Sequence, residues 1–252
     1  MKKHFILIVS ILLVILIQSC NKKEVKSESK NAAIIDSLPN NEEFEENGEE
    51  YDEDLSEDVE VIYPETGNKT ADFLPKPAIY EIQYEAKGDL NKDGLDDVIV
   101  VLKHKQVNTA KRPMLILLQN ANKTYRLDKV SDVVMPAEYN ENDFKFYDPE
   151  NISVEEGALR IYLWGGPHNM ILCKFKYSGK DLVLTYMTSY SGGAGQCIET
   201  TADYEKGEGT IAEIYTMDEN SSPISTFKTK SEKHLFENTS ILDLYNGEEN
   251  AP

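Results

Sequence analysis

The chain has 252 residues, of which 40% are apolar and 28% are charged, and its formal net charge at pH 7 is −19. This length and apolar content suffice for one domain of ordinary size or for two small ones. Twelve acidic residues and no basic residue lie between Asn41 and Glu60, so this block carries most of the net charge. The acidic balance excludes nucleic acid as an expected partner, because binding it requires a basic face.

The first twenty residues have the pattern of an export signal. Lys2 and Lys3 precede an uninterrupted apolar run over residues 5–17, so a positive n-region is followed by an h-region. The run is too short for a comfortable membrane-spanning helix. It ends in Ile17-Gln18-Ser19-Cys20. This ending resembles the lipobox of bacterial lipoproteins, with an aliphatic residue at −3, a small residue at −1 and then the cysteine.

The lipoprotein resemblance implies cleavage before Cys20 and a diacylglycerol on its sulfur, so that residues 1–19 are a signal peptide. Several acyl chains on one cysteine give stable membrane anchoring, whereas a single chain gives only marginal binding. Asn21 follows the cysteine. In lipoproteins of Gram-negative bacteria an aspartate there favours the inner membrane, so the resemblance implies the outer membrane. The alternative is a simple secretory signal or an N-terminal membrane anchor.

Residues 20–72 are predicted to be a lipidated, disordered linker. The segment has few aromatic residues and many Ser, Asn, Lys and Glu residues, so it cannot bury enough apolar surface to offset its ordering entropy. About fifty flexible residues reach on the order of 40 Å, and repulsion between like charges extends them further. A domain after this linker can therefore stand clear of the membrane. The alternative is that the acidic block binds cations or docks a partner.

Residues 73–246 are predicted to form a single, mainly antiparallel β domain, either a twisted sheet or a sandwich of hairpins. Short apolar or alternating runs are separated by Gly, Asn, Pro and Asp, which is typical of strands and turns, and no amphipathic helix is expected. The nearly continuous apolar runs at 98–102 and 114–118 indicate central strands covered on both faces. Further strands are expected at 80–85, 124–130, 159–163, 170–177, 182–190, 210–217 and 224–228. Residues 247–252 are expected to be disordered.

The segment 88–97 has the pattern D-x-N-x-D-G-x-x-D directly before an apolar strand. Side-chain oxygens at positions 1, 3 and 5 can surround one cation, glycine at position 6 permits a sharp turn, a main-chain carbonyl serves at position 7 and a carboxylate at position 9. The expected ligands are Asp89, Asn91, Asp93, the carbonyl of Leu95, and Asp97. Oxygen ligands alone select calcium or magnesium.

This loop, at 89–97, resembles the calcium loop of FG-GAP and VCBS-type repeats. An EF-hand would need Glu at position 12, where Val100 stands. The loop occurs once, whereas propellers need several copies, so the resemblance implies a structural calcium ion and no propeller. It extends to uncharacterised secreted bacterial proteins that carry such repeats, and it implies no activity. Clustered aspartates repel each other unless a cation compensates; the alternative is an Asn/Asp/Gly turn without metal.

After lipidation of Cys20, two cysteines remain, Cys173 and Cys197. In an oxidising envelope they are a candidate disulfide, which would stabilise the fold by roughly 3 kcal/mol in the entropic model. The alternative is two separate buried thiols, because the alternation over 170–177 places Cys173 on an apolar face with Ile171 and Phe175.

No catalytic residue is assigned. His104, His168 and His234 stand alone without metal-ligand spacing, and the chain has no H-E-x-x-H, G-x-S-x-G or phosphate-loop pattern. Residues 189–196 can form either an anion-cradling loop of backbone amides or the end of a hairpin. The candidate ligand contacts are Trp164, His168 and Tyr190. Trp164 can stack on a sugar, although a single Trp at a strand end can also belong to the core or its rim.

Two functions follow from these features. The favoured one is a non-enzymatic, calcium-stabilised β module that binds a cell-envelope protein or glycan and is held on the membrane by its lipid. The alternative is an envelope hydrolase with a site near His104 or His168, which requires a pocket that gathers one of these histidines with carboxylates.

Overall fold

The structure, a computed structural model, describes residues 61–193, 195–215 and 223–247. Contacts divide the chain into two units, Met1–Glu57 and Asp58–Pro252, and all described residues belong to the second unit. The expected signal peptide, Cys20 and most of the expected linker therefore lie outside the described residues, as do residues 248–252.

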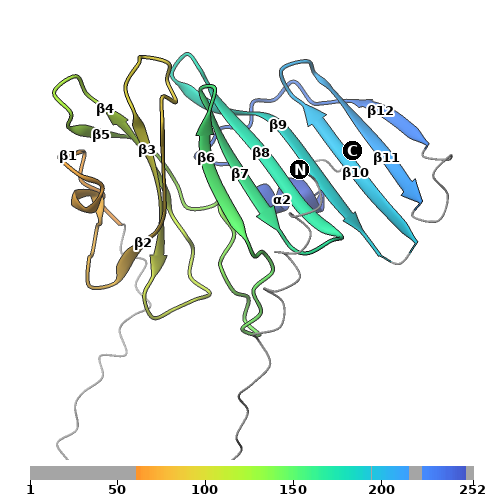
Figure 1. Cartoon of the computed structure of the whole chain (residues 1–252), viewed down its shortest axis with the longest axis horizontal. Coiled ribbons are helices and arrows are strands. Elements are labelled where there is room, and N and C mark those ends of the chain that lie inside the picture. Colours follow the sequence, from red (N-terminus) through yellow and green to blue (C-terminus); the bar gives the residue numbers. More distant parts are fainter. Residues whose placement is uncertain (1–60, 194, 216–222, 248–252) are drawn as a thin grey trace, which may run out of the picture. The chain divides into compact units, whose positions relative to one another are not determined.

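The described residues form two antiparallel sheets (Figure 1), which confirms a mainly β, antiparallel fold. The five-stranded sheet has the order β1-β5-β4-β3-β2, and its strands are β1 (Thr66–Gly67), β2 (Tyr80–Gly88), β3 (Asp97–His104), β4 (Met114–Gln119) and β5 (Tyr125–Ser131). The seven-stranded sheet is a meander of consecutive strands, β6 (Glu150–Glu155), β7 (Ala158–Trp164), β8 (Asn169–Ser178), β9 (Asp181–Gly192), β10 (Gln196–Asp203), β11 (Glu208–Tyr215) and β12 (Ile224–Lys228).

The five-stranded sheet is buried on both faces, as its apolar runs predict. Ile99 and Val101 of β3 belong to the core shared with the other sheet, whereas Val98 and Val100 lie in a second cluster on the opposite face. Phe73, the last residue of the 3-10 helix η1 (Thr70–Phe73), closes that second cluster. Continuous runs of β-branched and large aliphatic residues are what a strand covered on both faces requires.

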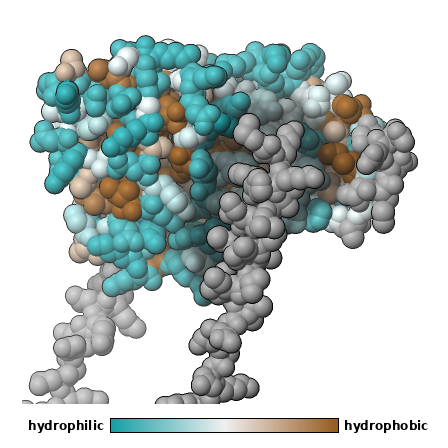
Figure 2. Space-filling view, viewed as in Figure 1, coloured by the Kyte–Doolittle hydropathy of each residue, from teal (hydrophilic) through white to brown (hydrophobic). Residues whose placement is uncertain are grey.

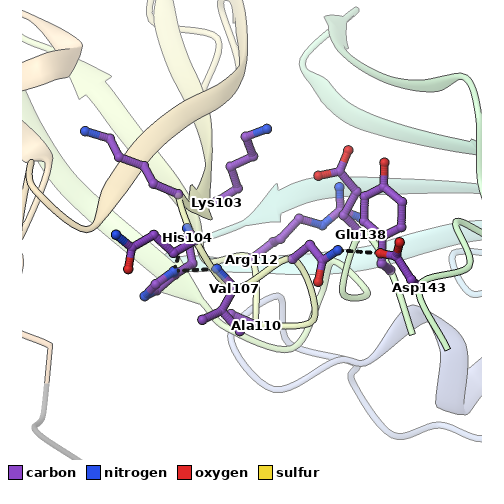
Figure 3. Close-up of a pocket in the computed structure, with 11 residues that line it drawn as sticks. Lys103, His104, Val107, Ala110, Arg112, Glu138 and Asp143 are labelled. Atoms are coloured by element: carbon purple, nitrogen blue, oxygen red, sulfur yellow. Dashed lines mark hydrogen bonds between the residues drawn. The ribbon is translucent and has the colours of Figure 1, made fainter. Parts of the chain in front are cut away.

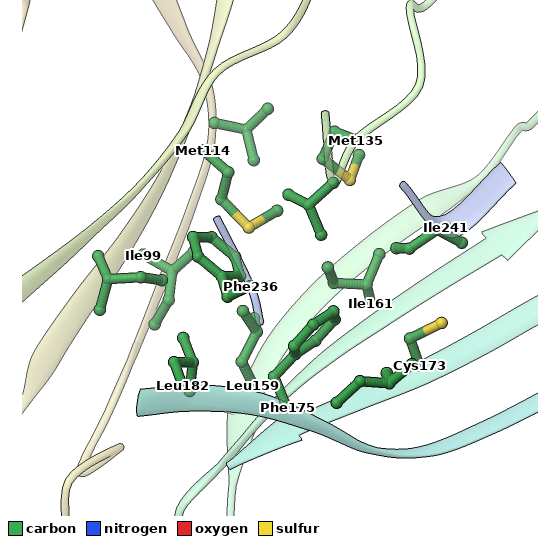
Figure 4. Packing of buried hydrophobic residues seen from close by; sticks show 14 of the residues in the cluster. Ile99, Met114, Met135, Leu159, Ile161, Cys173, Phe175, Leu182, Phe236 and Ile241 are labelled. Carbon is green, nitrogen blue, oxygen red and sulfur yellow. The ribbon is translucent and has the colours of Figure 1, made fainter. Parts of the chain in front are cut away.

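The shared core lies between the two sheets (Figure 4). Ile99 and Met114 enter it from the five-stranded sheet, and Leu159 and Phe175 enter it from the seven-stranded sheet. The ring of Phe236 meets the ring of Phe175 edge to face, with centroids 5.7 Å apart. Burying each of these side chains contributes about 1.5–3 kcal/mol. The packing of the shared core is therefore what joins the two sheets into one unit.

The seven-stranded sheet contributes only one of its faces to the shared core. In β7 and β8, buried residues alternate with half-buried ones. Ile171, Cys173 and Phe175 lie on the core side and Lys174 on the opposite side, as the alternation over 170–177 predicts. The structure therefore leaves one broad sheet face that the core does not use.

Three parts of the fold differ from the prediction. Strands β6 and β10 were not expected, and neither was the short helix α2 (Ile241–Asn246). Helix α2 begins at Ser240, whose side chain accepts a hydrogen bond from the Asp243 N–H, and it ends at Gly247 with φ of 79°. A serine N-cap and a left-handed glycine C-cap satisfy backbone groups at the two ends of a helix.

The structured part of the chain also begins before residue 73, the predicted boundary. Strand β1 pairs Thr66 with Arg126 and Gly67 with Tyr125, and Tyr63 packs against the cluster around Phe73. The last part of the expected linker is therefore a cover for the five-stranded sheet. Within the described ranges, no helix has the length and apolar character needed to cross a bilayer.

Candidate functional site

Residues from distant parts of the sequence line up on the outer face of the seven-stranded sheet, which is the face that points away from the shared core. Side chains of directly paired residues on neighbouring strands lie on the same face. The first row of such pairs runs from β7 to β12 and consists of Trp164, Met170, Tyr190, Glu199, Ala212 and Ile224. Neighbouring strands are about 4.8 Å apart, so the backbones of Trp164 and Tyr190 are separated by roughly 10 Å. The structure thus brings these two predicted contact residues to one surface, on either side of Met170.

A second row on the outer face runs beside the first and is rich in hydroxyl groups. It consists of Asn151, Tyr162, Leu172, Thr188, Thr201, Thr210 and Thr226. The hydroxyl oxygens of Thr188 and Thr201 are 3.1 Å apart and share a hydrogen bond. A threonine hydroxyl both donates and accepts, so this row can match the alternating donors and acceptors of a polyhydroxy ligand.

A third row on the outer face carries charges of both signs. It consists of Ser153, Arg160, Lys174, Tyr186, Asp203, Glu208 and Lys228. The ammonium group of Lys174 lies 5.0 Å from the centre of the Tyr186 ring, a cation–π contact. Figure 2 shows that apolar surface also remains at the edge formed by β11 and β12, where Ile224 is 67% exposed.

His168 lies at the end of these rows rather than inside them. It precedes Asn169, the first residue of β8, and Asn169 pairs with Ser191 of β9. Its ring nitrogen Nδ1 is 3.5 Å from the sulfur of Cys197 in β10. The third predicted contact residue therefore shares an end of the sheet with Tyr190, and its described partner is a thiol.

The aspartate-rich loop at 89–97 separates into two parts. In the first part, three predicted ligands converge: the Asp93 N–H donates to Asp89 Oδ1 at 2.9 Å and to Asn91 Oδ1 at 3.0 Å. The Asn91 side-chain amide donates to Asp93 Oδ2 at 2.9 Å. Positive φ angles at Lys92 (62°) and Gly94 (86°) turn the backbone around this point. Hard oxygens gathered on one side of a tight turn are the donor set that calcium takes.

Asp97, the ligand expected at position 9, has a different role in the described fold. It is fully buried and accepts backbone N–H bonds from Leu90 (3.0 Å), Asn91 (3.2 Å) and Gln119 (3.0 Å). Burial raises the pKa of this carboxyl above its usual value, although these N–H bonds oppose the shift. Asp97 therefore fastens the loop to β4, and it lies close enough to Asp93 for the two carboxylates to repel each other.

The remaining predicted ligand, Leu95, follows this turn. Its N–H donates to Asp93 Oδ1 at 2.9 Å. Among the described residues, no group of three or more His, Cys, Asp or Glu side chains is gathered as in a metal centre. The side chains that converge in the loop are two carboxylates and one amide, and all are oxygen donors. This set fits calcium or magnesium and does not fit a metal that prefers nitrogen or sulfur.

A cavity of about 460 Å³ lies beside the turn after β3 (Figure 3). Its lining gathers His104 and Arg112 with Glu138 and Asp143. His104 Nδ1 accepts the backbone N–H groups of Gln106 (3.1 Å) and Val107 (2.9 Å). A neutral imidazole has one unprotonated nitrogen, and a general base uses that nitrogen to accept a proton. In His104 this nitrogen accepts hydrogen bonds from the turn.

The two carboxylates of this cavity are engaged elsewhere. Glu138 pairs with Lys145 at 3.2 Å, and Asp143 accepts the side-chain amide of Asn108 at 2.6 Å. The described contacts of the cavity thus contain no carboxylate–histidine pair of the kind that orients a catalytic imidazole.

Cys173 and Cys197 are separate buried thiols, which is the second of the two alternatives open from sequence. Cys173 pairs with Met187 and Cys197 with Gly192, five residues further along β9. The two thiols also lie on opposite faces of the sheet, because Cys173 belongs to the shared core. Burial raises the pKa of Cys173, which has only apolar surroundings.

The described residues of the stretch 189–196 form the end of a hairpin. Ser189, Ser191 and Gly192 lie in β9, and the Gly193 N–H donates to the Gln196 carbonyl at 3.1 Å. Of the two alternatives for this stretch, the described backbone corresponds to the hairpin turn.

Comparison of the chain with protein-family models, with curated proteins and with solved structures gives no match. The function is therefore inferred from the chain's own residues and geometry.

The contact between His168 and Cys197 was not predicted, because it joins residues 29 apart in sequence. The flanking glycines at 165, 166, 192 and 193 are the sequence signal that two close turns meet there.

Proposed function

We propose that this protein is a lipid-anchored module of the bacterial cell envelope that binds an extended glycan on the outer face of its seven-stranded sheet. The observation that carries the proposal is the first row, which sets Trp164, Met170 and Tyr190 side by side on a solvent-facing sheet. Flat aromatic side chains contribute large contact area, and Tyr and Trp are enriched where one side of the ring is apolar and the other wet.

The composition of the outer face favours a glycan over a protein partner. The aromatic row lies beside a row of four threonines, so apolar ring faces and hydroxyl groups alternate over short distances. Sugars present C–H faces and hydroxyl edges at the same spacing. The apolar centre of a stable protein interface is more continuous and less hydroxylated. Because Asp and Glu outnumber Lys and Arg by 45 to 26 in the chain, a neutral glycan meets less repulsion than an anionic one.

Sedimentation with insoluble polysaccharides tests the glycan proposal. We expect the full chain to co-sediment with at least one of three probes, which are cellulose, chitin and purified peptidoglycan sacculi. Trp164→Ala and Tyr190→Ala should each weaken binding about tenfold, which corresponds to roughly 1.4 kcal/mol. Tyr190→Phe, which keeps the ring, and Tyr139→Ala, in the cavity after β3, should bind like the wild type. Equal binding by the wild type and all four variants contradicts the proposal, and so does the absence of binding to any of the three probes.

A calcium ion at the 89–97 loop is the second part of the proposal. The ion would be held by the side chains of Asp89, Asn91 and Asp93 and by the carbonyl of Leu95, with Asp97 keeping the loop closed behind them. An affinity of about 10⁻⁴ to 10⁻³ M is expected for an extracellular module of this kind. Such an ion stabilises the fold and does not act as a signal.

Thermal melts in millimolar calcium and in excess chelator test the ion. At about ten times the dissociation constant, calcium adds roughly 1.4 kcal/mol, which raises the melting temperature of a domain of this size by about 3–5 °C. Asp93→Asn keeps the acceptor for the Leu95 N–H and loses the charge, so it should fold and lose the calcium response. Identical melting temperatures of the wild type in calcium and chelator contradict this part.

The lipid anchor at Cys20 is the third part, and it places the module on the outer membrane of the envelope. Metabolic labelling with a fatty-acid analogue should mark the wild type and leave Cys20→Ser unlabelled and uncleaved. Unchanged labelling of Cys20→Ser contradicts the anchor and leaves the other two parts standing.

A further inference from the structure

The outer face has a second chemical feature at its end, where two polar side chains meet around the thiol of Cys197. His168 Nδ1 is 3.5 Å from Cys197 Sγ. A hydrogen bond between the Tyr190 hydroxyl and the same thiol is the main cause that raises the pKa of Tyr190. Three residues that are far apart in the chain, one thiol, one imidazole and one phenol, therefore share one hydrogen-bonded cluster.

Gly192 is the residue that makes this cluster possible. It pairs directly with Cys197 on the neighbouring strand, and a Cβ added at Gly192 would lie 2.7 Å from Cys197 Sγ. Because position 192 has no side chain, the imidazole of His168 can reach across it to the thiol. A Cβ at Gly193 or Gly195 would meet no atom within 4 Å, so the close approach is specific to Gly192.

The thiol is covered by a group that can move away. Cys197 is fully buried, whereas His168 is exposed. His168 follows Gly165, Gly166 and Pro167, and Gly166 has a positive φ of 104°. Exposed side chains change rotamer readily, so this imidazole can move without disturbing the core.

We propose that Cys197 is a reactive thiol that exchanges with disulfides, with His168 as its base. The Cys197 S–H gives its proton to His168 Nδ1, and the sulfur attacks one sulfur of an incoming disulfide. A new S–S bond forms to Cys197 while the old S–S bond breaks, and the leaving thiolate takes the proton from the imidazolium. No other oxidant is needed, because the incoming disulfide is itself reduced. A neighbouring imidazole is what activates a cysteine for such attack.

Cys173 supplies a control within the same chain. It is also fully buried, but it lies on the core side of the sheet among apolar side chains and has no polar partner of this kind. Nucleophilic reactivity requires the thiolate, which an apolar environment disfavours. If burial alone governed the two thiols, they would react alike; if the cluster governs Cys197, only Cys197 reacts.

Among the described residues, two titratable side chains lie near the pair on the same face of the sheet. Tyr190 lies on β9, and Glu199 lies two residues along β10 on the same face, where it pairs with Tyr190. Ile214 is the residue opposite Cys197 on β11. The glutamate is shared by every variant below, so it does not affect the comparison.

The test is the rate of reaction with 4,4′-dithiodipyridine, a neutral disulfide, in the full chain carrying Cys20→Ser. We expect one thiol to react in the folded protein, peptide mapping to identify it as Cys197, and Cys173 to react only after denaturation. His168→Gln should slow the reaction at pH 7 at least about tenfold, and its rate should rise about tenfold per pH unit between pH 6 and 8, as for an isolated thiol of pKa about 8.5. The wild-type rate should change less with pH.

Thermal melting of His168→Gln checks that the fold is kept, because His168 is exposed and its removal leaves the core intact. Two results overturn the proposal. One is that neither thiol reacts in the folded protein within the time in which both react after denaturation. The other is that Cys197 reacts in His168→Gln with the rate and pH dependence of the wild type. Neither result depends on whether the outer face binds a glycan.

Discussion

Arg112 is a buried arginine that makes four hydrogen bonds. Its guanidinium donates to Glu150 at 2.6 and 2.7 Å, to the Pro136 carbonyl at 2.6 Å and to Gln83 at 3.2 Å. Only 1% of the Arg112 side chain and 2% of the Glu150 side chain are exposed. The pair therefore links the turn before β4 with β2 and β6. Because both groups are shielded from water, each charge is compensated by the other.

Removing one partner of this pair should cost more than removing both. Glu150→Gln leaves the Arg112 charge buried without compensation, so the free energy of unfolding should fall by about 3–5 kcal/mol. The double variant Arg112→Met/Glu150→Leu should lose less than Glu150→Gln alone, because it leaves no uncompensated buried charge. Urea unfolding of the three proteins measures both values. A loss below about 1 kcal/mol in Glu150→Gln contradicts the buried pair.

Tyr84 gives a pH dependence with a defined sign. Burial, followed by the charge and hydrogen bond of Glu150, raises its pKa to about 12. The folded protein then holds this proton more tightly than the unfolded chain, whose tyrosines titrate near pH 10. Stability from this group is complete below about pH 10 and is lost as the pH rises toward 12. Urea melts at pH 8, 9, 10 and 11 should show a shallower decline for Tyr84→Phe than for the wild type; parallel declines contradict the assignment.

Substitution of Asp97 tests whether its hydrogen bonds to the backbone hold the loop in place. Its two oxygens accept three backbone N–H groups, and Asn offers only one acceptor oxygen. Asp97→Asn should therefore leave at least one buried N–H facing a donor and lower the free energy of unfolding by about 1–3 kcal/mol. The comparison is made in chelator, so that any ion is absent from both proteins. A stability equal to that of the wild type would show that Asp97 does not fasten the loop.

At the scale of elements, periodicity predicted the strands that have a clear apolar pattern. β3 and β4 are continuous apolar runs and β8 alternates, so their positions follow from burial on two faces or on one. β6 was missed because Glu150 occupies a core-facing position and interrupts the pattern. β10 was missed because it is rich in threonine and faces solvent on much of its length. In both strands pairing with neighbours overrides local hydrophobicity.

Helix α2 is too short for its periodicity to stand out, and its caps are the signals that mark it. Ser240→Ala removes the acceptor for the Asp243 N–H and should lower the free energy of unfolding by about 1 kcal/mol. Ser240→Asp, which restores an acceptor at the N-cap, should recover the loss. Thermal melts give the melting temperature of the wild type and of both variants. Equal melting temperatures would show that the cap does not contribute to stability.

At the scale of the whole molecule, the sequence predicts the parts of the candidate site that are local and not the parts that depend on strand register. The 89–97 loop is continuous in sequence, so its donor residues could be named in advance. In the structure Asp97 also accepts a hydrogen bond from Gln119 of β4, and this contact lies outside the loop and could not be predicted from its pattern. Trp164 and Tyr190 were each named as contacts, yet their place in one row follows only from the pairing of β7, β8 and β9.

The two faces of the seven-stranded sheet differ in what they contact. The inner face supplies the core that joins the sheets. The outer face is broad, partly aromatic and unused by that core. A long acidic linker before the domain would keep this face away from the membrane and within reach of envelope polymers.

Fluorescence of Trp164 tests the proposed glycan face most directly, because Trp164 is the only tryptophan of the chain. The full chain is titrated with cellohexaose, chitohexaose and a peptidoglycan-derived disaccharide peptide while its emission is recorded. The proposal predicts a saturable change with at least one of them, weakened about tenfold in Tyr190→Ala and retained in Tyr190→Phe. Emission that stays constant with all three, in protein that still melts cooperatively, contradicts a glycan site on the outer face.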